Sequence, residues 1–111
     1  MGNTEKHRFV IIEPNHTELA VQERAEPFAL KEMQEAVGGY IEAIPLVIVS
    51  ADAACAIIAV NNLLKTERFY VFANEDGRML KQKPNPLASA VLGVELLGPV
   101  LVCSDELIEE E

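Results

Sequence analysis

The order of apolar and polar residues along the chain predicts short strands that alternate with helices. Residues 8–13 form a β-branched run that predicts a buried strand, and residues 14–17 supply turn-forming side chains. Residues 18–23 mix polar and apolar positions, as a strand near a sheet edge does. These segments together predict an N-terminal β-hairpin.

A helix is predicted over residues 27–37. Pro27 suits the first turn, where its missing N–H costs nothing, and apolar residues then recur at helical spacing. Gly38 can adopt the left-handed conformation that ends a helix. Because glycines that bind phosphate precede a helix, Gly38 and Gly39 predict a helix end and not a phosphate loop.

A strand over residues 40–44 follows directly. Tyr40, Glu42 and Ile44 lie on the same side of this strand, so the carboxylate of Glu42 stands between two residues that prefer to be covered. Two interpretations stay open. This side of the strand is solvated, or Glu42 lies in a cleft and binds a ligand amine or hydroxyl.

Residues 51–65 are rich in alanine and predict a second helix, with Asp52 in its first turn. The apolar positions of this helix extend beyond a single stripe. The helix therefore either packs into the core on most of its sides or carries a homodimer contact with a second copy of the chain.

Residues 69–73 are aromatic and β-branched and predict a strand, and residues 78–82 predict its hairpin partner. Residues 74–77 form the turn between them, where Gly77 can adopt a positive φ. Asn74 and its acidic neighbours also resemble part of a calcium loop. The twelve-residue spacing and the closing glutamate of such a loop are missing, so a plain turn is favoured.

A third helix is predicted to start at Asn85 and to stop at Gly93. Asn85 is a favourable N-cap, and Pro86 then occupies the first helical position. Residues 100–103 are continuously apolar, which is typical of a strand covered on both faces.

These elements predict one α+β domain with the order ββαβ(α)ββαβ. The simplest arrangement is a mainly antiparallel sheet with the helices packed on one face. The globular body spans residues 8–103, and residues 104–111 form an acidic tail.

The charge of the chain limits the classes of partner. There are 18 acidic residues against 9 basic ones, for a formal net charge of −9, and five of the acidic residues lie in the last seven positions. Direct binding to nucleic acid is disfavoured, because it needs clustered lysine and arginine. A solubilising tail is favoured, and a basic protein partner is the other interpretation.

The cysteines and the apolar segments indicate a soluble cytoplasmic protein. Cys55 and Cys103 lie in apolar surroundings without metal-ligand spacing, so we expect two buried, reduced thiols. The N-terminal residues contain no signal-peptide segment, and the apolar run at residues 46–60 is too short to span a bilayer.

No catalytic set can be assembled from the spacing of the serines, histidines and acidic residues, so an enzyme is not favoured and no cofactor or metal is expected. The residues with chemistry suited to a ligand pocket are Tyr40, Glu42, Asn74 and Asn85. A small basic cluster, Arg78, Lys81 and Lys83, precedes the Asn85 helix start. It predicts either a weak anion-binding corner or a solvated edge.

Four segments occur in an order that is similar to a known family: LKEMQEAVGGYIE at 30–42, NEDGR at 74–78, PNPLA at 84–88 and LGPVLV at 97–102. The chain resembles an uncharacterised family of small domains encoded by phages, plasmids and bacterial genomes. The resemblance covers most of residues 8–103 and is weakest over residues 47–68, where a shorter connection is expected in the family. It implies a phage or mobile-element origin and a location in the host cytoplasm, and it supplies no catalytic residues.

Two functions follow from these observations. The first is a non-enzymatic accessory protein, of inhibitor or counter-defence type, that binds a host protein through its acidic surface and its alanine-rich helix. The alternative is a small-molecule or nucleotide-binding module with a pocket near Tyr40 and Glu42. A hydrolase is the third and least supported possibility.

Overall fold

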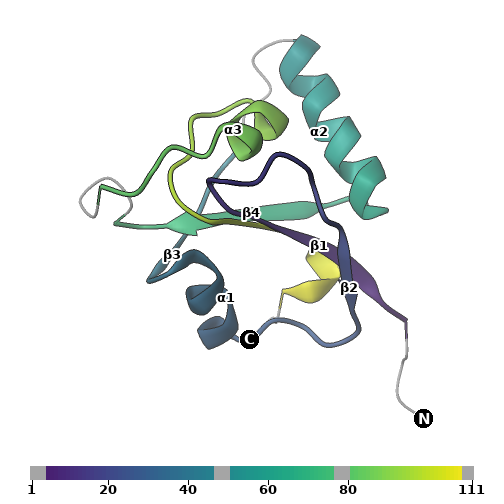
Figure 1. Ribbon diagram of the computed structural model, residues 1–111. Helices are drawn as coiled ribbons and strands as arrows, with labels where there is room; N and C mark the ends of the chain where they lie inside the picture. Colours follow the sequence, from purple (N-terminus) through teal and green to yellow (C-terminus); the bar gives the residue numbers. More distant parts are fainter. Residues whose placement is uncertain (1–4, 47–50, 77–80, 109–111) are drawn as a thin grey trace.

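The centre of the structure is a sheet of five antiparallel strands in the order β2-β1-β5-β4-β3 (Figure 1). This computed structural model describes residues 5–46, 51–76 and 81–108. The elements along the described chain are β1 (His7–Ile12), β2 (Gln22–Arg24), α1 (Leu30–Val37), β3 (Ile41–Ala43), α2 (Ala51–Leu64), β4 (Phe69–Asn74), α3 (Pro86–Leu92), β5 (Val100–Ser104) and the 3₁₀ helix η1 (Asp105–Leu107). The predicted α+β class and antiparallel sheet are confirmed.

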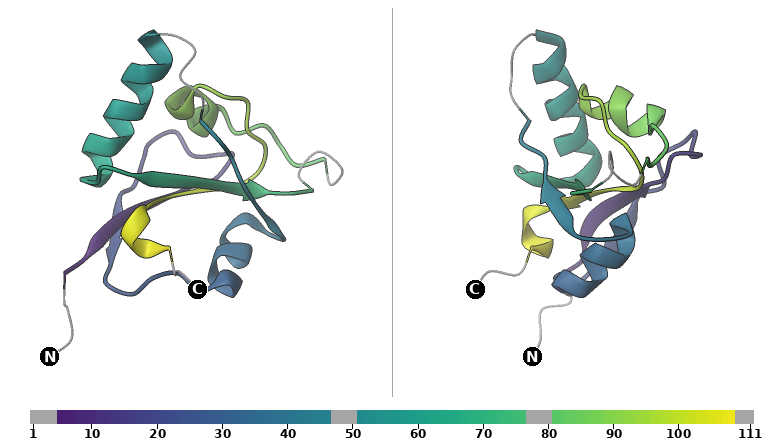
Figure 2. Two further views of the ribbon diagram at one scale, coloured as in Figure 1. Left: turned by 180° about the vertical axis from the view of Figure 1, so that it is seen from behind. Right: turned by 90° about the vertical axis from the view of Figure 1, so that its left-hand side faces the viewer.

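The helices lie on both faces of the sheet, so the expected one-sided packing is wrong (Figures 1 and 2). The cause is visible in β5, the central strand, in which all five residues are buried. Val100 and Val102 face the cluster formed with α2 and α3, whereas Leu101 and Cys103 face the cluster formed with α1 and η1. A strand that is apolar at every position needs cover on each side.

Several predicted bounds change because of tertiary hydrogen bonds. The first helix starts at Leu30 and not at Pro27, since the backbone N–H of Phe28 donates to the carbonyl of Leu107 at 2.8 Å and holds the chain extended there. The N–H of Ala29 then donates to the Glu32 carboxylate at 3.0 Å. At the other end of α1, Gly38 has a φ of 79°.

The second strand of the predicted N-terminal hairpin is also shorter than expected and covers only Gln22–Arg24. The predicted partner strand at residues 78–82 falls mostly outside the described residues, as does Gly77, and Lys81 and Gln82 are not in a strand.

The predicted acidic tail is partly a structural element. Ser104 ends β5, Leu107 is fully buried, and Ile108 forms a bridge to Phe28. The packed body therefore continues to Ile108. This contact was not evident in the sequence, because acidic residues stand on both sides of Leu107 and Ile108, the two apolar residues that dock.

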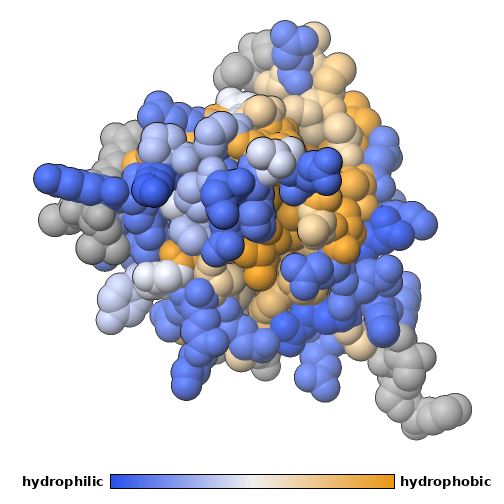
Figure 3. Space-filling view, in the orientation of Figure 1, coloured by the Kyte–Doolittle hydropathy of each residue, from blue (hydrophilic) through white to orange (hydrophobic). Residues whose placement is uncertain are grey.

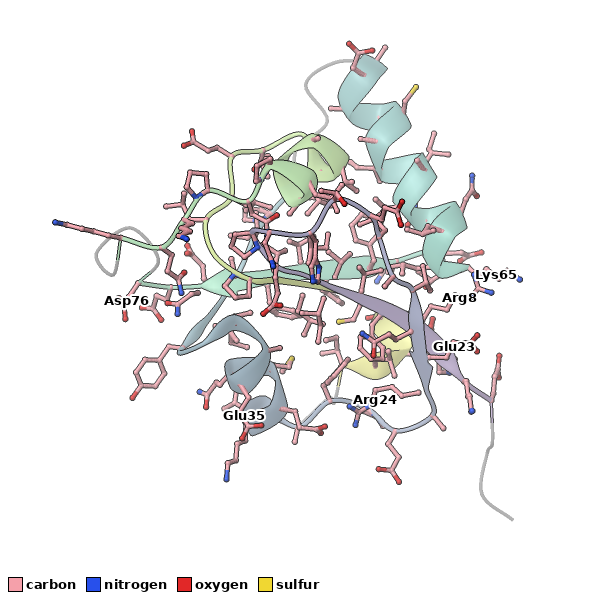
Figure 4. All side chains as sticks on the ribbon, viewed as in Figure 1. Arg8, Glu23, Arg24, Glu35, Lys65 and Asp76 are labelled. Carbon is pink, nitrogen blue, oxygen red and sulfur yellow. The ribbon has the colours of Figure 1, made fainter. Side chains whose placement is uncertain are left out.

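The long helix α2 is anchored only through its C-terminal half. Its buried residues are Val60 and Leu64. At this end the Arg8 guanidinium donates to the Leu63 carbonyl at 3.1 Å, which places a positive charge at the negative end of the helix dipole. Figure 4 shows Arg8 beside Lys65 where α2 meets β1. Residues 51–59 include no buried side chain and extend beyond the sheet (Figure 1).

Candidate functional site

The four residues predicted to bind a ligand do not come together in one pocket. Tyr40 is 68% exposed, and Glu42 is exposed on the edge strand β3, where it pairs with Ala73. Asn74 lies close to this edge, but its amide group is directed inward. Asn85 starts α3, which covers the opposite face of the sheet from α1.

Asn74 has a structural role at the end of β4. Its Nδ2 donates to the carbonyl of Val37 at 3.3 Å, and its Oδ1 accepts from the N–H of Asp76 at 2.8 Å. These bonds tie the last turn of α1 to the turn that follows β4. A methyl group at Gly39 would lie 2.8 Å from the Asn74 amide nitrogen, so this glycine allows the close approach.

Asn85 is more completely bonded. Its Oδ1 accepts from the N–H of Ala88 at 3.1 Å, and its Nδ2 donates to the carbonyls of Ile12 and Gly98, both at 2.8 Å. The residue is fully buried, and its hydrogen bonds join three separate segments of the chain. Pro86 occupies the first turn of this helix, and Gly93 ends it with a φ of 74°. The chemistry of Asn85 is used within the fold.

The predicted anion-binding corner has little support in the structure. Lys83 lines an open hollow of about 650 Å³ that also contains Glu13. The adjacent helix α3 has only seven residues, and Asn85 already accepts from the N–H of Ala88 at its start. Arg78 lies outside the described residues.

The most interconnected polar group surrounds Glu106. Its carboxylate accepts from the Ser104 hydroxyl at 2.5 Å and from the Thr66 hydroxyl at 3.2 Å, and it lies 3.4 Å from Nδ1 of His7. The Ser104 hydrogen bond is the main cause that lowers the pKa of Glu106, and Thr66 and His7 add to it. This network fastens η1 to α2 and β1. Since it contains no activated nucleophile, it has the character of a structural contact.

The two cysteines differ. Cys103 is buried in β5 as expected, and burial raises the pKa of its thiol to about 12, with a smaller effect from Asp105. The expectation that Cys55 is also buried is wrong, because Cys55 lies on the outer side of α2. No group of three histidine, cysteine or acidic side chains suited to a metal occurs in the described ranges.

The outer side of α2 is the most unusual surface of the molecule. Its exposed residues, here named the α2 outer face, are Ala51, Asp52, Cys55, Ile58, Ala59 and Asn62. The Ile58 side chain is 57% exposed. Figure 3 shows apolar residues gathered over much of α2 and over the surface below it, whereas hydrophilic residues cover most of the rest of this view. A helix that is apolar on nearly all sides is normally covered on all sides.

A cleft of about 410 Å³ lies between α2 and the edge of β4. Ile44, Pro45 and Leu46 form one wall, Ile57 and Asn61 form the other, and residues 69–71 form the floor, with the exposed Glu67 and Arg68 at the rim. The left view of Figure 2 shows the segment that leaves β3 crossing β4, with α2 beyond it. This cleft was not predicted from the sequence. Pro45 is the signal that could have found it, because a proline ends strand pairing.

Comparison of the chain with protein-family models, with curated proteins and with solved structures finds no match. Among the described residues, no helix combines the length and the apolar character that crossing a bilayer requires.

Proposed function

We propose that the chain is a non-enzymatic accessory domain that binds a host protein through the α2 outer face. The observation that carries this proposal is the exposure of an alanine-rich helix whose first nine residues include no buried side chain. Exposed apolar surface of this kind is typical of a site for another macromolecule. The proposed phage or mobile-element origin, and hence the host partner, depends on the family resemblance.

The charge of the chain indicates what kind of surface the partner should have. The chain carries a net charge of −9, but on the α2 outer face only Asp52, in the first turn of the helix, is charged. A protein with an apolar contact surface surrounded by lysine and arginine would complement this arrangement, because the surrounding charges steer association while the apolar centre supplies affinity.

Co-purification with matched variants tests the proposal. Ile58 on α2 and Leu30 on α1 are both 57% exposed, so Ile58→Glu and Leu30→Glu introduce the same charge at equal exposure. We expect a host protein to co-purify with the wild type and with Leu30→Glu but to be lost with Ile58→Glu. A partner retained by Ile58→Glu, or lost equally with both variants, would contradict the proposal.

A second copy of the chain is the other occupant that the α2 outer face favours. In an antiparallel pair of α2 helices, the end with Asp52 lies beside the end with Lys65, so charges of opposite sign meet and the helix dipoles oppose. The mass of the protein in solution, measured by sedimentation, distinguishes a homodimer from a complex with a host protein. A mass of two chains that falls to one in Ile58→Glu supports the homodimer, and an unchanged mass removes this face as its interface.

The small-molecule alternative has less support. Asn74 and Asn85 would have to give up hydrogen bonds within the fold in order to contact a ligand. Tyr40 and Glu42 remain as exposed side chains at the edge of β3.

A further inference from the structure

The cleft between α2 and β4 contains an open segment of sheet edge. β3 pairs with β4 only from Ile41 to Ala43, and one further bond joins the N–H of Ile44 to the carbonyl of Val71 at 2.8 Å. Pro45 follows and carries no N–H. Beyond this bond, no described residue of the segment after β3 bonds to the edge of β4 beside Phe69, and this stretch of edge is here named the open lane.

The backbone groups of Phe69 point into this lane. Successive residues of a strand direct their N–H and C=O groups to opposite edges. Val71 bonds toward β3, whereas Arg68 bonds toward β5, since its carbonyl accepts from the N–H of Asp105 at 3.0 Å. Phe69 is two residues before Val71, so its N–H and C=O point to the same edge as those of Val71. No described residue bonds to these groups of Phe69.

The wall of α2 adds an unsatisfied acceptor. Oδ1 of Asn61 is buried and has no hydrogen-bond partner among the described residues. A buried acceptor without a donor is unfavourable, so a ligand that donates a hydrogen bond to it gains affinity. Together the cleft offers a donor and an acceptor on Phe69 and a second acceptor on Asn61. Its apolar lining includes Ile44 and Leu46 on one wall and Ile57 on the other.

We propose that this cleft binds a short extended peptide of a protein partner, which adds as a strand to the edge of β4. Strand addition satisfies the N–H and C=O of Phe69 together, and one apolar peptide side chain fills the space beside Ile57. Glu67 and Arg68 stand at the rim with opposite charges, so the proposed peptide is uncharged at its centre. The open lane is short, which favours a peptide of a few residues over a second β4 strand.

This site deepens the proposed function, since it states which kind of partner segment is held, but it can be tested alone. The probe is a blocked five-residue peptide of alternating threonine and valine, titrated to millimolar concentration into isotope-labelled protein. We expect the amide signal of Phe69 to shift and its hydrogen exchange to slow at least tenfold at saturation. N-methylation of the central valine should weaken binding at least tenfold, because it removes the donor to the Phe69 carbonyl.

Two protein variants complete the test. Asn61→Leu should weaken peptide binding without lowering the urea midpoint of unfolding, since no described residue donates a hydrogen bond to the Asn61 amide oxygen. Ile58→Glu should leave peptide binding unchanged. The peptide assay therefore tests the cleft, the co-purification assay tests the α2 outer face, and either proposal can be wrong without the other. An unaffected Phe69 amide, equal binding of the N-methylated peptide, or a Phe69 shift that depends only on protein concentration would overturn the proposal.

Discussion

At the scale of the residue, asparagine side-chain amides form hydrogen bonds within the fold, and only some of these bonds could be predicted from the sequence. The N-cap position of Asn85 followed from its place before Pro86, because capping is a local relation. Its two bonds to the carbonyls of Ile12 and Gly98 could not be predicted, since they join segments that are 73 and 13 residues distant. The Asn85 amide, which the sequence indicated as a possible ligand-binding group, forms its hydrogen bonds within the fold instead.

Substitution of Asn85 should therefore be costly. Asn85→Leu leaves the N–H of Ala88 and two carbonyls without their partner in a fully buried place, and each such group costs about 1–3 kcal/mol. We expect the free energy of unfolding in urea to fall by about 3 kcal/mol or more. Asn85→Asp should be at least as costly, because its carboxylate still accepts from Ala88 but directs an acceptor at the carbonyls of Ile12 and Gly98 in a fully buried place. The exposed Asn15→Ala serves as the control and should change stability by less than about 0.5 kcal/mol.

At the scale of the element, the helices and most strands could be predicted from periodicity, and their placement could not. Helical spacing and the glycines at 38 and 93 indicate where α1 and α3 end, because these are local signals. The side of the sheet that each helix covers depends on long-range packing. The continuously apolar β5 contained the information that both faces are covered, but it did not say by which helix.

The composition of α2 does not predict which of its apolar residues are buried and which are exposed. Its alanines and isoleucines predicted a helix that is buried or paired, and both possibilities were left open. Val60 and Leu64 anchor one half to the sheet, while Cys55 and Ile58 remain on an open face. No local signal separates a buried apolar residue from an exposed one within the same helix.

This asymmetry should appear in amide hydrogen exchange. The amides of residues 55–59 should exchange at least tenfold faster than those of residues 61–64 in the same helix, because only the second group adjoins buried side chains. Exchange followed by NMR provides the measurement, and the two halves of α2 act as mutual controls. Uniform protection along α2 would show that the first half is covered in solution.

At the scale of the whole molecule, an acidic chain presents a largely apolar helix face and, beside Phe69, a short stretch of the β4 edge to which no described residue bonds. The radius of gyration of 13.7 Å is close to the roughly 13 Å expected for a folded chain of this length, so the helix is a local projection from a well-packed body. The strand order could not be predicted, because β5 comes last in sequence and lies at the centre. The outer face of α2 and the cleft beside it became visible only once these elements were placed.

The affinity of the co-purified host protein for three forms of the chain tests the central claim most directly. Titration calorimetry with wild type, Ile58→Glu and Leu30→Glu should give dissociation constants in which Ile58→Glu is at least tenfold weaker, which corresponds to about 1.4 kcal/mol, and Leu30→Glu is within about twofold of wild type. A dissociation constant for Ile58→Glu equal to that of wild type would contradict the assignment of binding to the α2 outer face.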